Sequence, residues 1–222
     1  MKAVINMFKA VLWDLDGTLL YTLEDLQDAC NYALVKNGYR PISRAETRQR
    51  IGNGIGRLFA LSVPDGADNE KLPQIRKDFS EYYLPHCTDK TVPYEGIVEL
   101  VRELKEKGVK NAIVTNKIHS AVAMISNRYF GDMMDVGLGE RENVRRKPDP
   151  QSVFEALALL NVRPQEACYI GDSDVDVKTA RNAGMTAIAV SWGYRDRDVL
   201  EACQPDFIAD DADQLREYLL CR

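Results

Sequence analysis

Residues 10–26 read AVLWDLDGTLLYTLEDL, an apolar run that stops abruptly at two carboxylates. The first four residues have the composition of a buried strand, and Asp14 and Asp16 follow at once, with a Gly-Thr pair behind them. Asp, Gly and Thr are common turn residues, so the motif alone is also compatible with a solvated turn. The remaining motifs of the chain show whether residues 14–18 are a solvated turn or part of a functional site.

The overall composition is that of an ordinary globular protein. The chain has 222 residues, 45% hydrophobic and 28% charged, with a formal net charge of -5. This charge gives no electrostatic footprint for nucleic acid or for acidic membranes, so we expect neither as a partner. No apolar run reaches transmembrane length, and no secretory cleavage pattern follows the N-terminus. We therefore expect a soluble protein of the cytoplasm.

The cysteines support the same expectation. They are odd in number and scattered, and no C-x-x-C pair occurs among Cys30, Cys87, Cys168, Cys203 and Cys221. Neither a disulfide framework nor a zinc site is indicated by such a distribution.

Three further apolar runs resemble the first, namely NAIVTN (111–116), ACYIGD (167–172) and TAIAVSWG (186–193). Their apolar residues are consecutive rather than alternating, which is typical of strands covered on both faces of a parallel sheet. Helical patterns lie between the runs, as in residues 97–104, where apolar residues follow the i, i+3, i+4, i+7 spacing. Alternating strands and helices predict a doubly wound, Rossmann-like α/β core.

In such sheets, ligands bind outside the carboxyl ends of the strands. Three of the predicted strand ends carry polar side chains suited to chemistry: Asp14, Thr115 and Asp172. The sequence therefore predicts one polar site at that edge.

The pattern changes between Thr22 and roughly Cys87, where no convincing strand occurs. Amphipathic helical stripes take over, and SRAE (43–46) has the form of a capping box at the start of a helix. We interpret this region as an insertion. The predicted domains are a core of residues 1–18 and 90–222 and an all-helical cap of residues 19–89, connected closely enough to hinge.

Four short motifs stand at or near the predicted strand ends: DLDGT (14–18), TNK (115–117), RKPDP (146–150) and GDSDVD (171–176). Singly, each could be a turn, a strand end, a loop or a helix cap. In this order, they resemble the four motifs of the haloacid dehalogenase superfamily, and specifically its phosphoglycolate phosphatase-like branch, which carries a helical cap after the first motif. The resemblance extends along most of the chain and implies phosphoryl-transfer chemistry.

A divalent cation is expected on physical grounds. Asp14, Asp16, Asp172 and Asp176 would repel one another in a partly dehydrated pocket unless a cation offset their charge. Mg²⁺ prefers oxygen ligands and commonly bridges to a phosphate. The resemblance implies that the carboxylates of Asp14 and Asp172 and the backbone carbonyl of Asp16 bind the ion, while Asp176 either binds it or orients the other ligands.

The resemblance also implies catalytic roles for the first motif. Asp14 is the expected nucleophile, because a carboxylate that attacks phosphorus divides one difficult displacement into two easier ones. Asp16 is expected to protonate the leaving oxygen and then to activate water. Gly17 lets the backbone turn close beside the phosphate.

The second and third motifs are expected to bind the phosphoryl group. Thr115 supplies a hydroxyl donor and Lys147 a cation, and such charge stabilisation is most of what phosphoryl transfer requires from a protein. Asn116 follows the family pattern as a substrate contact, with a simple hydrogen bond at the strand end as its alternative.

The segment RIGNGIGRLF (50–59) interrupts a helical pattern with three glycines, each at a cost of about 1 kcal/mol relative to alanine. A bend between cap helices is one explanation, and a loop that points into the site is the other. The resemblance favours the second. Arg50, Asn53 and Arg57 are then candidates to bind a substrate carboxylate or second phosphate.

The predicted function is Mg²⁺-dependent hydrolysis of a small phosphorylated metabolite, with phosphoglycolate as the leading substrate, by a monomer or homodimer. A phosphomutase of β-phosphoglucomutase type and a pyrophosphatase or nucleotidase are the alternatives. Thr18 is more typical of the phosphatases, and Asp16 argues against a dehalogenase, which lacks this acid. Tyr21 stands where close relatives usually carry Asp, which weakens the transfer of a specific substrate.

Overall fold

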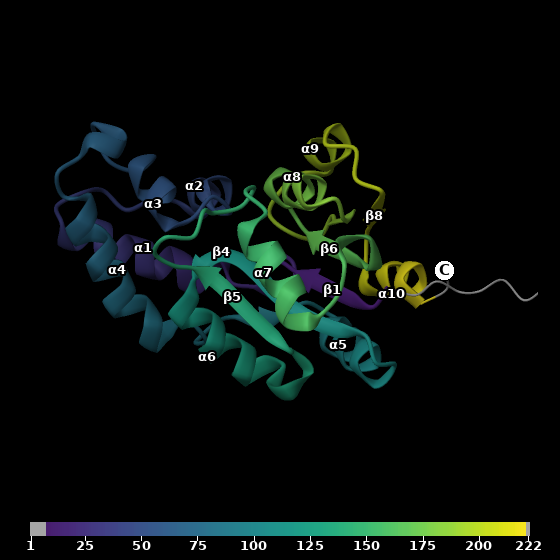
Figure 1. The fold of residues 1–222 in the computed structure, drawn as a ribbon. Coiled ribbons are helices and arrows are strands. Elements are labelled where there is room, and N and C mark those ends of the chain that lie inside the picture. Colours follow the sequence, from purple (N-terminus) through teal and green to yellow (C-terminus); the bar gives the residue numbers. More distant parts are fainter. Residues whose placement is uncertain (1–7, 221–222) are drawn as a thin grey trace, which may run out of the picture.

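The computed structural model describes residues 8–220, and a six-stranded parallel sheet forms its centre (Figure 1). Strand β1 (Ala10–Trp13) is fully buried and lies between β4 (Lys110–Ile118) and β6 (Ala167–Gly171). The strand order is β5-β4-β1-β6-β7-β8. The remaining strands are β5 (Val136–Glu140), β7 (Thr186–Val190) and β8 (Phe207–Ala209). This sheet confirms the predicted fold class.

Helices cover both faces of the sheet, which explains why its strands are apolar on consecutive positions. Val11 and Trp13 contribute to the core beneath α5 (Ile97–Glu106), α6 (His119–Tyr129) and α10 (Ala212–Leu220). Ala10 and Leu12 face the opposite core, which includes α7 (Gln151–Leu160), α8 (Asp174–Ala183) and α9 (Arg197–Ala202). Two 3-10 turns, η2 (Gly131–Met133) and η3 (Pro164–Glu166), complete the connections.

Along the sequence, a helical insertion lies between β1 and β4, the next strand of the central sheet. Two short strands, β2 (Leu20–Tyr21) and β3 (Val92–Pro93), pair antiparallel where the chain leaves and re-enters the core. Between them lie α1 (Leu23–Lys36), α2 (Arg44–Arg50), α3 (Ile55–Ala60), η1 (Gly66–Asp68) and α4 (Leu72–His86). Figure 1 shows these helices, in purple and blue, grouped at one end of the molecule.

Within the insertion, α1 and α4 lie against each other, and their buried apolar residues belong to the same cluster as those beneath α5, α6 and α10. The predicted capping box at the start of α2 is present, because Ser43 and Glu46 exchange side-chain and backbone hydrogen bonds. The domain limits at residues 18, 19, 89 and 90 stay a prediction, and the outermost parts of the predicted core, residues 1–7 and 221–222, lie outside the described residues.

The order of the strands decides where the site lies. The chain runs from β1 outward to β4 and β5, then returns to the other side of β1 with β6, β7 and β8. The carboxyl ends of β1, β4 and β6 are therefore neighbours at the point where the strand order reverses, which is where open α/β sheets bind ligands. Within residues 8–220, no helix combines the length and apolar character needed to cross a bilayer.

Candidate active site

Three buried carboxylates meet at the carboxyl end of the sheet. Asp14 follows β1, Asp172 follows β6, and Asp176 belongs to the first turn of α8. Each offers an oxygen, and these oxygens lie within 4.8 Å of one another. Lys147 reaches into the cluster, with its Nζ 2.9 Å from Asp14 Oδ1 and 2.7 Å from Asp176 Oδ1. The structure thus brings together residues from the first, third and fourth motifs.

The cluster is electrostatically unbalanced. Burial, together with the charges of Asp176 and Asp14, raises the pKa of Asp172 from 3.8 to about 8. Burial also raises the pKa of Asp176, although Lys147 acts in the opposite direction. Burial alone would lower the pKa of Lys147, but Asp14 and Asp176 outweigh it, so the pKa lies well above its ordinary range. The lysine therefore stays charged, and one ammonium does not offset three carboxylates.

The donor atoms fit a hard divalent cation. Asp14 Oδ1 is buried and, despite its proximity to Lys147, forms no hydrogen bond of acceptable geometry. Both oxygens of Asp176 are engaged, Oδ1 by Lys147 and Oδ2 by the backbone N–H and hydroxyl of Ser173. Asp14 thus offers the freest oxygen. Asp172 accepts from the Thr18 hydroxyl at 3.4 Å and from the Tyr194 N–H at 2.6 Å, and Asp176, which is also held by Lys147, suits an orienting role. An all-oxygen set of this kind matches the preference of Mg²⁺.

Two glycines allow the chain to close around Asp172. Gly17 has φ +86°, and a Cβ there would lie 2.4 Å from Asp172 Oδ2. A Cβ at Gly193 would lie 2.2 Å from Asp172 Cβ, and the next residue, Tyr194, donates its N–H to Asp172 Oδ2 at 2.6 Å. The sequence identified the first glycine and missed the second, which stands at the end of the predicted TAIAVSWG strand.

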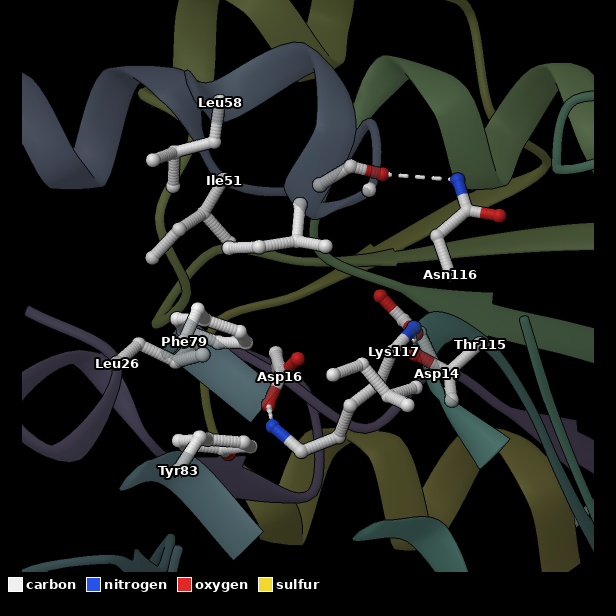
Figure 2. Close-up of a pocket in the computed structure, with 14 residues that line it drawn as sticks. Asp14, Asp16, Leu26, Ile51, Leu58, Phe79, Tyr83, Thr115, Asn116 and Lys117 are labelled. Carbon is white, nitrogen blue, oxygen red and sulfur yellow. Dashed lines mark hydrogen bonds and ion pairs between the residues drawn. The ribbon is translucent and has the colours of Figure 1, made fainter. Parts of the chain in front are cut away.

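The second motif lies in an irregular stretch of β4, because the register with β5 shifts between Val114 and Ile118. Asn116 Nδ2 donates to the carbonyl of Gly52 at 3.0 Å and to that of Lys147 at 3.2 Å, and its Oδ1 accepts the Lys147 N–H at 2.9 Å. Figure 2 shows the bond to the Gly52 carbonyl as a dashed line. Asn116 therefore connects the cap loop, at Gly52, to the backbone of Lys147. Thr115, buried beside it, faces the same cavity.

A cavity of about 50 Å³ lies between the cap and the strand ends, with room for a few water molecules (Figure 2). Its core side is mainly polar, and its cap side is mainly apolar. The core contributes Asp14, Asp16, Thr115, Asn116, Lys117 and Ile118; the cap contributes Leu26, Ile51, Gly52, Gly54, Ile55, Leu58, Phe79 and Tyr83.

The cap loop reaches this cavity through its glycines rather than through its predicted polar side chains. Gly52 and Gly54 line the cavity, whereas Arg50 binds Glu46 and Ser62, each at 3.0 Å. Arg57 is exposed and Asn53 is half-buried, and neither is a lining residue.

A core arginine that the sequence analysis did not single out holds the same loop. Arg195 donates to the carbonyls of Arg48 and Ile51, at 3.1 and 2.6 Å. These are backbone carbonyls near the end of α2, where a cation is favourable.

Asp16 is paired with a residue to which the sequence analysis gave no role. Lys117 Nζ lies 2.6 Å from Asp16 Oδ1, and its side chain is only 2% exposed. The same ammonium lies 4.9 Å from the centre of the Tyr83 ring, on α4 of the cap. Burial raises the pKa of Tyr83 well above its ordinary range, so its hydroxyl is neutral. The sequence did carry a signal for this site residue, because Lys117 is a charged residue close to the end of a strand that is otherwise apolar and buried.

Fold and site together define the class: a doubly wound α/β protein with an acidic, lysine-containing site at the switch point of its sheet, beneath a helical insertion. The chain belongs to the haloacid dehalogenase-like hydrolase family, whose sequence model matches residues 11–190. This confirms the family to which the four motifs pointed.

Relatives resemble the chain over nearly its whole length. A phosphoglycolate phosphatase of Rhodospirillum rubrum is 32% identical and is aligned over 96% of this chain and 91% of its own. The pyrophosphatase PpaX of Bacillus cereus is 33% identical and is aligned over 94% of this chain and 95% of its own. One similar crystal structure is that of a protein from Lactobacillus delbrueckii subsp. bulgaricus, provisionally named a phosphoglycolate phosphatase. It is 34% identical to this chain, and the two superpose with a TM-score of 0.90 over 97% of this chain and all of that one.

Proposed function

We propose that the protein is a phosphatase that hydrolyses a small phosphomonoester through an aspartyl-phosphate on Asp14. The observation that carries this proposal is the buried Asp14 carboxylate, 2.9 Å from the Lys147 ammonium, with Asp16 lining the same cavity. In the first step, an Asp14 oxygen forms a bond to phosphorus, the bond to the leaving oxygen breaks, and Asp16 gives that oxygen its proton. In the second, water attacks the phosphorus, Asp16 takes the proton of the water, and phosphate departs from Asp14.

The phosphoryl oxygens need donors while charge develops on them. We propose that Lys147 and Thr115 supply them, with Gly17 allowing close approach of the backbone. Asn116 acts from beside them, because it fixes the backbone of Lys147.

We propose that Mg²⁺ is bound by the carboxylates of Asp14 and Asp172 and by the backbone carbonyl of Asp16, with Asp176 and Ser173 orienting this set. When bound, the ion would offset the negative charge of the carboxylates and of the phosphoryl group.

Phosphoglycolate remains the leading substrate, supported by the relative from R. rubrum. Pyrophosphate is the second candidate, which the equally similar PpaX relative favours. Substrate contacts by Arg50, Asn53 and Arg57 stay a prediction, as do the monomeric or homodimeric state and the cytoplasmic location.

The test is a phosphate-release screen with Mg²⁺ and with EDTA over phosphoglycolate, pyrophosphate, nucleoside monophosphates and β-glucose 1-phosphate, using Asp14→Asn as the inactive control. We expect release that requires both Mg²⁺ and Asp14, fastest on phosphoglycolate. Conversion of β-glucose 1-phosphate to glucose 6-phosphate with negligible phosphate release would reject hydrolysis. Loss of phosphoglycolate turnover in Arg50→Ala or Arg57→Ala, with 4-nitrophenyl phosphate turnover kept, would support the predicted arginine contacts.

A further inference from the structure

The Lys117–Asp16 ion pair joins two motifs at the base of the cavity. Asp16 follows β1, whereas Lys117 lies in the irregular stretch of β4, 101 positions further along the chain. Their side chains are 13% and 2% exposed, and the 2.6 Å contact is drawn as a dashed line in Figure 2. A charge-assisted hydrogen bond in such a buried position is short and strong, so it fixes the direction of the carboxylate.

The cap holds the lysine in place. Lys117 has a flexible stem, and it would lose rotamer freedom if it bound Asp16 without other support. The Tyr83 ring of α4 supplies that support, because it is fully buried and lies 4.9 Å from the ammonium. A desolvated cation–π contact of this kind is favourable. Three residues from three parts of the fold therefore form one stack: Tyr83, Lys117 and Asp16.

We infer that Lys117 is a positioning residue, which holds the Asp16 carboxylate where it can exchange a proton with the leaving oxygen. This inference rests on the proposed function. A general acid must lie within hydrogen-bond reach of the atom that it protonates, and a misplacement of about 1 Å can cost as much as 100-fold in rate. The ammonium keeps its own proton throughout and touches neither the phosphoryl group nor the leaving oxygen.

The alternative role for Lys117, which lines the cavity, is binding of a substrate carboxylate. The geometry favours positioning, because Asp16 already offsets the charge of the ammonium at 2.6 Å. A substrate carboxylate would have to displace Asp16 from it. The two roles differ in which substrates should suffer when the lysine is removed.

The experiment compares kcat/KM of wild type and Lys117→Met on phenyl phosphate and 4-nitrophenyl phosphate, in Mg²⁺. The two substrates have nearly the same shape, but 4-nitrophenolate leaves without a proton, and kcat/KM reports only steps up to formation of the aspartyl-phosphate. We expect a loss of about tenfold or more on phenyl phosphate and of less than about threefold on 4-nitrophenyl phosphate. Tyr83→Leu should show the same selectivity more weakly, and Lys117→Arg should restore part of the loss.

The matched control is Lys36→Met, which removes another lysine paired with a buried aspartate at 2.7 Å, in the cap and outside the cavity. It should leave both kcat/KM values unchanged. Thermal melts establish that each variant is folded.

A double-mutant cycle supplies the second measurement. In an Asp16→Asn background, adding Lys117→Met should change kcat/KM on phenyl phosphate by less than about twofold, because the group that it positions is already gone. Equal losses on both substrates, or full additivity in the cycle, would overturn the inference. So would a loss confined to the KM of phosphoglycolate, which would make Lys117 a substrate contact. Absence of Mg²⁺-dependent activity in the wild type would instead refute the proposed function itself.

Discussion

Replacing Asp172 by asparagine should stabilise the metal-free protein at alkaline pH. Asp172 is 3% exposed, and burial beside Asp176 and Asp14 raises its pKa from 3.8 to about 8. A group with a raised folded-state pKa holds its proton more tightly in the folded protein. Its contribution is therefore fully present below about pH 4 and is lost as the pH rises to about 8.

The magnitude follows from the two pKa values. A change from 3.8 to about 8 corresponds to at most about 6 kcal/mol across that pH window. Asparagine keeps an acceptor for the Tyr194 N–H and removes the charge. Replacement of buried ionic groups by neutral ones ranges from no effect to a gain of about 1–4 kcal/mol, and the raised pKa of Asp172 places this change within the stabilising range. For a domain of this size, we expect the melting temperature in EDTA at pH 8 to rise by about 3–10 °C.

The assay is thermal unfolding followed by circular dichroism at pH 5 and pH 8, in EDTA and in Mg²⁺. Wild type in EDTA should melt at a lower temperature at pH 8 than at pH 5, and Asp172→Asn should reduce that difference. Mg²⁺ at pH 8 should stabilise the wild type and not the variant. Asp132→Asn, which changes an exposed aspartate, should follow the wild type. A variant that melts below the wild type at pH 8 in EDTA would refute the electrostatic reasoning.

Three further changes test other parts of the structure. Gly17→Ala places a methyl group 2.4 Å from Asp172 Oδ2 at a positive φ, so it should lower stability by about 1–3 kcal/mol and abolish turnover, as melts and phosphate release will show. Ser43→Ala removes the capping box and should cost about 1 kcal/mol in a denaturant melt without changing kcat; an unchanged midpoint would contradict this. Asn116→Ala removes the hydrogen bonds to the carbonyls of Gly52 and Lys147, and should lower kcat/KM about tenfold or more while the fold persists. Unaltered kinetics would contradict a positioning role for Asn116.

The parallel sheet could be predicted because its central strands are long apolar runs that end in polar motifs. Strands β5 and β8 were not predicted. The first is a five-residue edge strand whose apolar pattern is interrupted by glycines at 137 and 139, and the second is apolar but has only three residues, so neither matches the longer apolar runs of the central strands. A Cβ at Gly139 would lie 2.5 Å from the Lys117 carbonyl, and this packing is visible only in three dimensions.

The core of the site could be predicted for a related reason. Asp14 and Asp172 directly follow their strands and Thr115 lies in the irregular last part of β4, so local sequence and topology agree on where these residues lie. The directions of the cap side chains could not be predicted, because tertiary partners decide them, as Glu46 and Ser62 do for Arg50. Pairs such as Lys117 and Asp16 depend on contacts between residues far apart in the chain.

The most direct test of the proposed chemistry is the chemical trapping of Asp14. Enzyme mixed with Mg²⁺ and phosphoglycolate, or with 4-nitrophenyl phosphate, is quenched during turnover and treated with borohydride, which reduces an acyl phosphate to an alcohol. Peptide mass spectrometry should then find residue 14 as the reduced alcohol in wild type, and should find no reduced residue in Asp14→Asn or in enzyme without substrate. Steady Mg²⁺-dependent phosphate release with residue 14 never reduced, or undiminished release by Asp14→Asn, would contradict the account.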